Sequence, residues 1–145
     1  METYHQLVDF ASKYKNIVVA LGMFDGLHIG HQKIICTAVE RARSIHGSAF
    51  VFSFTNHPRA IVDSLGAPRR ISSEQVSLRI LRNLGVDVLV EIPFTHDFAD
   101  TSPEEFIHLL YRHFSPRYIV VGENYTFGNH TFKIIIIIEK ITTIS

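Results

Sequence analysis

The chain has 145 residues, in which 14 Lys and Arg balance 14 Asp and Glu, so that its formal net charge is zero. This length is typical of a single domain, and a composition of 46% hydrophobic and 19% charged residues is globular rather than disordered. Surfaces that bind nucleic acid or anionic membranes need an excess of basic residues, which is lacking here. We therefore expect one domain over residues 1–145 that binds neither nucleic acid nor a membrane.

The first fifteen residues mix polar and apolar types without the continuous apolar core of a signal peptide. This pattern predicts a cytoplasmic protein. Its single cysteine, Cys36, has no second thiol with which to form an internal disulfide, and we expect it to be a buried structural thiol. The sequence leaves the oligomeric state open.

Four short apolar runs are predicted to be β-strands. They lie at residues 16–21, 49–54, 87–92 and 118–121, and the first and last run directly into a glycine. Apolar runs without polar alternation are typical of parallel strands that are covered on both faces. The sequence therefore predicts a parallel sheet between two layers of helices.

Helical patterns separate these strands. Residues 30–46 form the first pattern, in which one stripe is expected to be buried: Ile34, Ile35, Ala38, Ala42 and Ile45. The second opens at residues 72–75 with the spacing of a capping box, and its expected inner residues are Val76, Ile80, Leu81 and Leu84. The third combines a Ser102 cap with Pro103 and two acidic residues, and is expected to bury Phe106, Leu109, Leu110 and Phe114. Alternating strands and helices with right-handed crossovers favour a Rossmann-like, doubly wound parallel α/β sheet.

The segment with the clearest chemical signal is GMFDGLHIGH, at residues 22–31, between the first strand and its helix. Its three glycines allow tight turning and close backbone approach to a ligand. His28 and His31 are three residues apart at the start of the helix, so both rings can face one phosphate held over the helix N-terminus. Nucleotidyl transfer requires mainly positioning and charge stabilisation, which these groups supply.

Two other interpretations of this segment remain. In a chain with nine histidines, two of them three apart can occur by chance. Alternatively, both histidines and Asp25 supply the ligand types that bind zinc. The glycines, the preceding strand and the following helix favour the phosphate site, because that motif requires this structural context. Asp25 is then expected to cap or arrange the turn.

Three segments together resemble the bacterial riboflavin kinase/FAD synthetase family, in its amino-terminal FMN adenylyltransferase domain. Residues 22–32 resemble the first family motif, whose HxGH element is shared with other nucleotidyltransferases. Residues 54–58, FTNHP, resemble a second motif that usually reads Pro-His-Pro. Residues 122–128, GENYTFG, resemble a third, Gly-Glu-Asp-Phe-x-Phe-Gly. Residues 98–106 are also similar, and the resemblance covers roughly residues 16 to 130.

This resemblance implies transfer of AMP from ATP to FMN, which gives FAD and pyrophosphate, with Mg²⁺ accompanying ATP. It assigns the catalytic roles to His28 and His31 and assigns no protein ligand to the metal. The ATP-binding residues that it implies are Gly22, Met23, Phe24, Gly26, His28, Gly30, His31 and Gly122. The FMN-binding residues that it implies are Asn56, His57, Pro58, Asn124, Tyr125 and Phe127.

Several of these residues have a structural alternative. Asn-His-Pro is a common turn composition, and Tyr125 and Phe127 fit core packing as well as flavin stacking. Two further functions also stay open: a flavin or nucleotide-binding module without catalysis, and a related nucleotidyltransferase with another acceptor. No role is assigned to the remaining histidines, which are His5, His46, His96, His108, His113 and His130.

From about residue 131 the chain departs from the family. Residues 134–138 are five isoleucines, too few to span a bilayer, and are predicted to form a strand. An unprotected strand of this kind is an aggregation hazard. Family members continue into a Ser-Ser-Thr-x-x-Arg loop that helps to bind ATP, and then into a riboflavin kinase domain. Neither is found in this sequence, so we expect no kinase activity and an impaired adenylyltransferase.

Overall fold

The computed structural model describes residues 1–24, 27, 29–54, 74–122 and 141–144. Within these residues, six parallel strands form one sheet in the order β1-β4-β3-β2-β5-β6. The strands are β1 (Glu2–Tyr4), β2 (Ile17–Leu21), β3 (Ser48–Phe54), β4 (Val88–Ile92), β5 (Tyr118–Gly122) and β6 (Ile141–Ile144). Each of the four predicted strands is therefore present, with its ends within one residue of the prediction.

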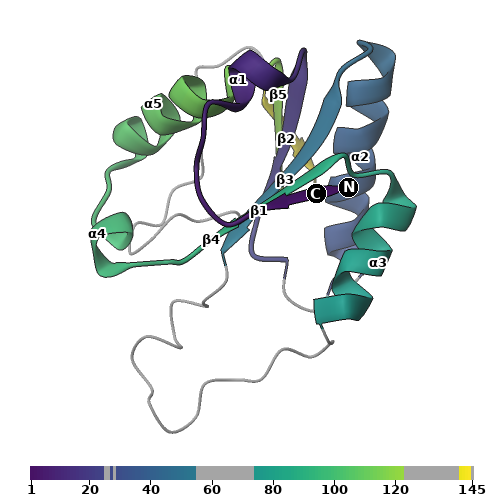
Figure 1. Cartoon of the computed structure of the whole chain (residues 1–145), viewed down its shortest axis with the longest axis horizontal. Helices are drawn as coiled ribbons and strands as arrows, with labels where there is room; N and C mark the ends of the chain where they lie inside the picture. Colours follow the sequence, from purple (N-terminus) through teal and green to yellow (C-terminus); the bar gives the residue numbers. More distant parts are fainter. Residues whose placement is uncertain (25–26, 28, 55–73, 123–140, 145) are drawn as a thin grey trace, which may run out of the picture.

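Helices cover both faces of this sheet (Figure 1). They are α1 (Phe10–Lys13), α2 (Ile29–Ser44), α3 (Glu74–Leu84), α4 (His96–Ala99) and α5 (Pro103–Phe114). Helix α2 packs across β2, β3 and β5 and contacts α3, whereas α1 contacts α5 on the opposite face. The three layers and the all-parallel pairing confirm the predicted Rossmann-like, doubly wound α/β fold.

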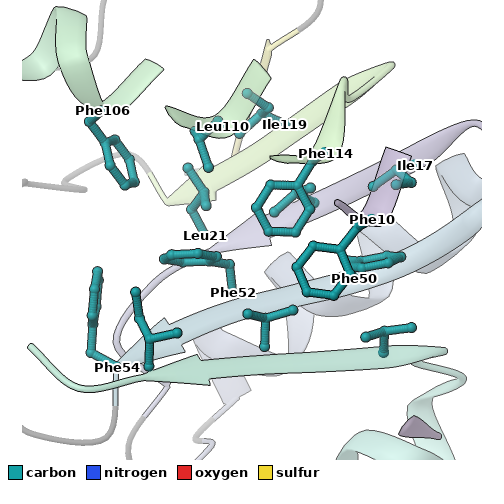
Figure 2. Close-up of a cluster of buried hydrophobic side chains, with 14 of the residues drawn as sticks. Phe10, Ile17, Leu21, Phe50, Phe52, Phe54, Phe106, Leu110, Phe114 and Ile119 are labelled. Atoms are coloured by element: carbon teal, nitrogen blue, oxygen red, sulfur yellow. The ribbon is translucent and has the colours of Figure 1, made fainter. Parts of the chain in front are cut away.

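The sheet separates two hydrophobic cores, because alternate side chains of each strand point to opposite faces. Ile17, Val19 and Leu21 of β2 enter the core beneath α1 and α5, whereas Val18 and Ala20 enter the core beneath α2 and α3. The first core is strongly aromatic, and its labelled rings come from α1, α5 and β3 (Figure 2). The second is built from smaller side chains, including Ala20, Ala38, Ala42 and Ala49.

The predicted helix caps and stripes are mostly confirmed. The Ser102 side chain accepts a hydrogen bond of 3.2 Å from the Glu105 amide, with Pro103 at the first turn of α5. The predicted inner residues that are fully buried are Phe106, Leu110, Phe114, Leu81, Ile35, Ala38 and Ala42. Residues 72 and 73 of the predicted capping box lie outside the described residues.

Four predicted inner residues are half-buried against the core beneath α2: Ile34, Ile45, Ile80 and Leu84. Three other burial predictions are wrong. Val76 is 43% exposed, because it lies roughly 140° around the helix axis from Leu81, which is buried in the core beneath α2. Leu109 is only half-buried, since the adjacent Leu110 occupies the position that faces the core. Cys36 is also half-buried, and it is a free thiol on the α2 surface next to the buried Ile35.

The sequence reading missed the amino-terminal elements β1 and α1. Strand β1 pairs with the edge of β4, with Thr3 opposite Leu89. The hydroxyl groups of Tyr4 and Tyr14 both donate to the Glu2 carboxylate, and these hydrogen bonds lower the pKa of that carboxyl group. Burial and the hydrogen bond to Glu2 raise the pKa of the Tyr14 phenol. These contacts hold the first fifteen residues against the sheet.

A charged network ties together the amino ends of the strands. Asp87 Oδ2 accepts a hydrogen bond of 2.7 Å from the Ala49 amide and lies 3.0 Å from Arg43 Nη1. Arg43 Nη2 also donates to the Gly85 carbonyl at 2.8 Å. One carboxylate therefore links the last turn of α2, the start of β3 and the turn before β4.

We expect Asp87→Ala to lower the free energy of unfolding by about 2 kcal/mol, because the partly buried Ala49 amide loses its acceptor. Asp87→Asn is expected to cost less, since it keeps an acceptor and since exposed ion pairs contribute little. Urea unfolding followed by circular dichroism measures both. Glu40→Ala, on the exposed face of α2, is the matched control and should change stability by less than about 0.5 kcal/mol. Equal stability of Asp87→Ala and this control would contradict the prediction.

Candidate phosphate-binding site

The candidate site lies where the order of strands reverses. After β2 the chain builds β3 and β4 on one side and then returns to add β5 on the other side of β2. Leu21 at the end of β2 is paired with Phe52 of β3 and with Val121 of β5. The carboxyl ends of β3 and β5 therefore lie on either side of the end of β2. In open parallel sheets, the carboxyl edge at such a reversal is the usual place for a ligand.

The segment that follows β2 crosses this carboxyl edge. Met23 packs against the aromatic core beneath α5, whereas Phe24 and Leu27 are buried in the core beneath α2, at 8% and 2% exposed. Consecutive side chains thus anchor the segment on opposite faces of the sheet.

Helix α2 begins at this edge, with Ile29, Gly30 and His31 in its first turn. That turn contains no acidic residue, and the first N–H groups of any helix lack partners within the helix. The positive end of the helix dipole is therefore available to an anion. His31 is half-buried there, and its ring contacts the Phe24 ring edge to face, with centroids 5.4 Å apart.

Two predicted site glycines lie close to other side chains. A Cβ atom on Gly22 would lie 2.7 Å from the Phe24 ring, which is closer than carbon atoms can approach without movement. A Cβ on Gly122 would lie 3.2 Å from Ile34 Cδ1 of α2. Gly22 therefore makes room for a ring that folds back beneath the segment, and Gly122 allows α2 to lie close to β5.

Leu27 and Gln32 contribute to the site without having been predicted. Leu27 adopts a left-handed backbone conformation with φ of 43°, which is unfavourable for a side chain of this size. Its buried side chain and a hydrogen bond of 2.9 Å from Gln32 Nε2 to its carbonyl oxygen hold this conformation. The sequence signal that could have pointed to Gln32 is its position directly after His31.

Part of the predicted site lies outside the described residues. This part comprises Asp25, Gly26, His28, Asn56, His57, Pro58, Asn124, Tyr125 and Phe127. The zinc alternative depends on two of them and stays untested. Among the residues that are described, no group of three or more His, Cys, Asp or Glu side chains is arranged to hold a metal ion. The described helices also include none that is long and apolar enough to cross a membrane.

The all-parallel sheet with helices on both faces places the chain among Rossmann-like α/β proteins. A family model described as FAD synthetase matches residues 10–140. The chain belongs to the FAD synthetase family.

Two relatives in sequence carry names that agree with this family. The chain is 32% identical over 129 residues to an FAD synthetase from Listeria monocytogenes, covering 88% of this chain and 52% of the relative. It is also 32% identical over 114 residues to the bifunctional riboflavin kinase/FMN adenylyltransferase of Bacillus subtilis, covering 78% and 36% respectively. The chain thus spans about half or less of the length of these relatives.

Solved structures with the same fold include a Streptococcus pneumoniae protein named as a macrolide-efflux protein. The TM-score is 0.76 at 26% identity, over 91% of this chain and 44% of that one. Pantothenate synthetase from Thermus thermophilus has a TM-score of 0.56 at 14% identity, over 86% of this chain and 52% of that one. This second likeness shows the shared fold alone.

The hydrogen bond from Gln32 yields a test of the turn before α2. We expect Gln32→Ala to lower the free energy of unfolding by about 1 kcal/mol, the typical net value of one hydrogen bond. Gln32→Glu should cost more at neutral pH, because a carboxylate oxygen then faces the Leu27 carbonyl oxygen. That repulsion raises the pKa of the substituted carboxyl group in the folded state, so the extra loss is present above this pKa and disappears on acidification.

Urea unfolding of each variant and the wild type, at neutral and acidic pH, measures these differences. Gln6→Glu is the control, because Gln6 is exposed near the amino terminus. Its stability relative to wild type should not depend on pH. A Gln32→Glu difference that is the same at both pH values would show that the side chain does not hold the turn.

Proposed function

We propose that this chain transfers AMP from ATP to FMN, forming FAD and releasing pyrophosphate. The observation that carries the proposal is the position of His31, in the first turn of α2, beside the end of β2 at the reversal of strand order. Membership of the FAD synthetase family supports the choice of reaction. The named activities of the Listeria and Bacillus relatives support FMN as the acceptor.

In the proposed reaction, a phosphate oxygen of FMN attacks the α-phosphorus of ATP. A new P–O bond forms as the bond to the β-phosphate breaks, and the electron pair leaves with pyrophosphate. The helix N–H groups and the imidazoles of His31 and His28 donate to the phosphate oxygens on which charge develops. No covalent intermediate with the protein is needed, because alignment of the two substrates supplies much of the rate.

Magnesium would enter with ATP and neutralise the triphosphate. The first turn of α2 has no carboxylate to ligate it, so the phosphates themselves are the expected ligands there. The residues of this chain would then bind the remaining phosphate oxygens with neutral or positive donors.

The flavin would occupy the part of the edge next to β3 and β5. We assign it to Asn56, His57 and Pro58, which follow β3 in the sequence, and to Asn124, Tyr125 and Phe127, which follow β5. Supporting this assignment, β3 and β5 flank β2 on either side. In open parallel sheets, ligands bind in the crevice outside the carboxyl ends of the strands.

Incubation of the full chain with FMN, ATP and Mg²⁺, followed by chromatographic separation of flavins, tests the proposal. We expect FAD and pyrophosphate in equal amounts. His31→Ala and His28→Ala should each lower kcat by about 100-fold, the usual effect of losing one donor to a charged transition state. His108→Ala, in an exposed position on α5, is the control and should keep wild-type turnover.

Calorimetry with each substrate separates the other outcomes. Binding of FMN and ATP without FAD formation would favour a non-catalytic flavin or nucleotide-binding module. AMP transfer to another phosphate acceptor but not to FMN would favour a related nucleotidyltransferase. Loss of folding in both histidine variants, measured by circular dichroism, would show that His28 and His31 have a structural role.

A further inference from the structure

The Phe24 side chain lies beneath the site and contacts the His31 imidazole. The two ring centroids are 5.4 Å apart, and the ring planes are inclined at 84°. Such an edge-to-face arrangement is a preferred geometry for planar rings and disfavours rotation of either ring. Phe24 therefore contacts the histidine on the side that faces the protein core.

The Phe24 ring is not available to stack on a ligand. It is only 8% exposed and packs in the core beneath α2 together with Leu27 and Ile35. Gly22 completes the enclosure, because a Cβ there would lie 2.7 Å from two atoms of the ring. The ring is thus held by the core on one side and by the glycine backbone on the other.

We propose that Phe24 is a positioning residue that fixes the side-chain rotamer of His31 through this ring contact, and that Gly22 is glycine in order to admit the ring. His31 lies in the first turn of α2, where its backbone is fixed by the helix. Its remaining freedom is rotation about the side-chain torsions, and a neighbouring buried ring limits that rotation. Phe24 thus holds the His31 side chain in place and does not itself bind the ligand.

The consequence for turnover rests on the proposed function. A histidine that samples several rotamers aims its donor at the phosphate for only part of the time, which lowers kcat more than it weakens binding. We expect Phe24→Leu to reduce kcat about tenfold with KM for ATP changed less than about twofold. Phe24→Tyr keeps the ring and should restore most of kcat.

An NMR experiment tests the proposal without any turnover. Three-bond couplings from the backbone nitrogen and carbonyl carbon to Cγ report the χ1 rotamer of a labelled histidine, and the His31→Gln spectrum assigns the signal. We expect couplings of a single rotamer in the full wild-type chain and in Phe24→Tyr. In Phe24→Leu they should move to averaged values. Gly22→Ala should produce a similar change, because its methyl group displaces the ring.

Phe114→Leu is the matched control. Phe114 is 1% exposed and packs against Phe10 and Phe50, in the other core. It should destabilise the fold while leaving the His31 couplings unchanged. Averaged couplings in this control would overturn the proposal, because they would show general loosening. Unchanged couplings in both folded Phe24→Leu and folded Gly22→Ala would also overturn it, whether or not the chain makes FAD.

Discussion

The structure depends on the complete burial of β2 between β3 and β5. All five residues of this strand are at most 1% exposed, and each neighbouring strand pairs with it in parallel. A central strand with both faces covered must be apolar throughout, so its polar atoms are satisfied only by the adjacent strands. The chain can change direction and meet solvent only where β2 ends. This constraint places the start of the candidate site at Gly22.

The two cores differ in a way that matters for the site. Aromatic rings fill the space beneath α5, whereas alanines line much of the contact between α2 and the sheet. Small side chains let a helix lie close to the strands. Gly122 has no Cβ atom, which would lie 3.2 Å from Ile34 Cδ1 of α2. Helix α2 can therefore lie across three strands at once. Its amino-terminal turn is consequently held directly beside the end of β2.

The sequence was sufficient to predict the central sheet and its long helices, because continuous apolar runs and 3.6-residue stripes record burial directly. It did not reveal β1 or α1, which have three and four residues and depend on pairing with β4 and on the tyrosine contacts to Glu2. The place of the HxGH segment was also predictable, since it follows from one strand and one helix. The contributions of Leu27 and Gln32 were not, because a left-handed turn and its side-chain hydrogen bond exist only once the core has buried Leu27.

A phosphate site of this type has to combine a permissive backbone with fixed donors, and these requirements conflict. Glycines give the backbone room but contribute no packing that would hold it. Here the fixing contacts come from the apolar residues between them, with Met23 in one core and Phe24 and Leu27 in the other. A segment anchored in both cores cannot shift without disturbing both. The apolar residues Met23, Phe24 and Leu27 therefore matter to the candidate site as well as its glycines and His31, because they anchor the described part of the segment in the two cores.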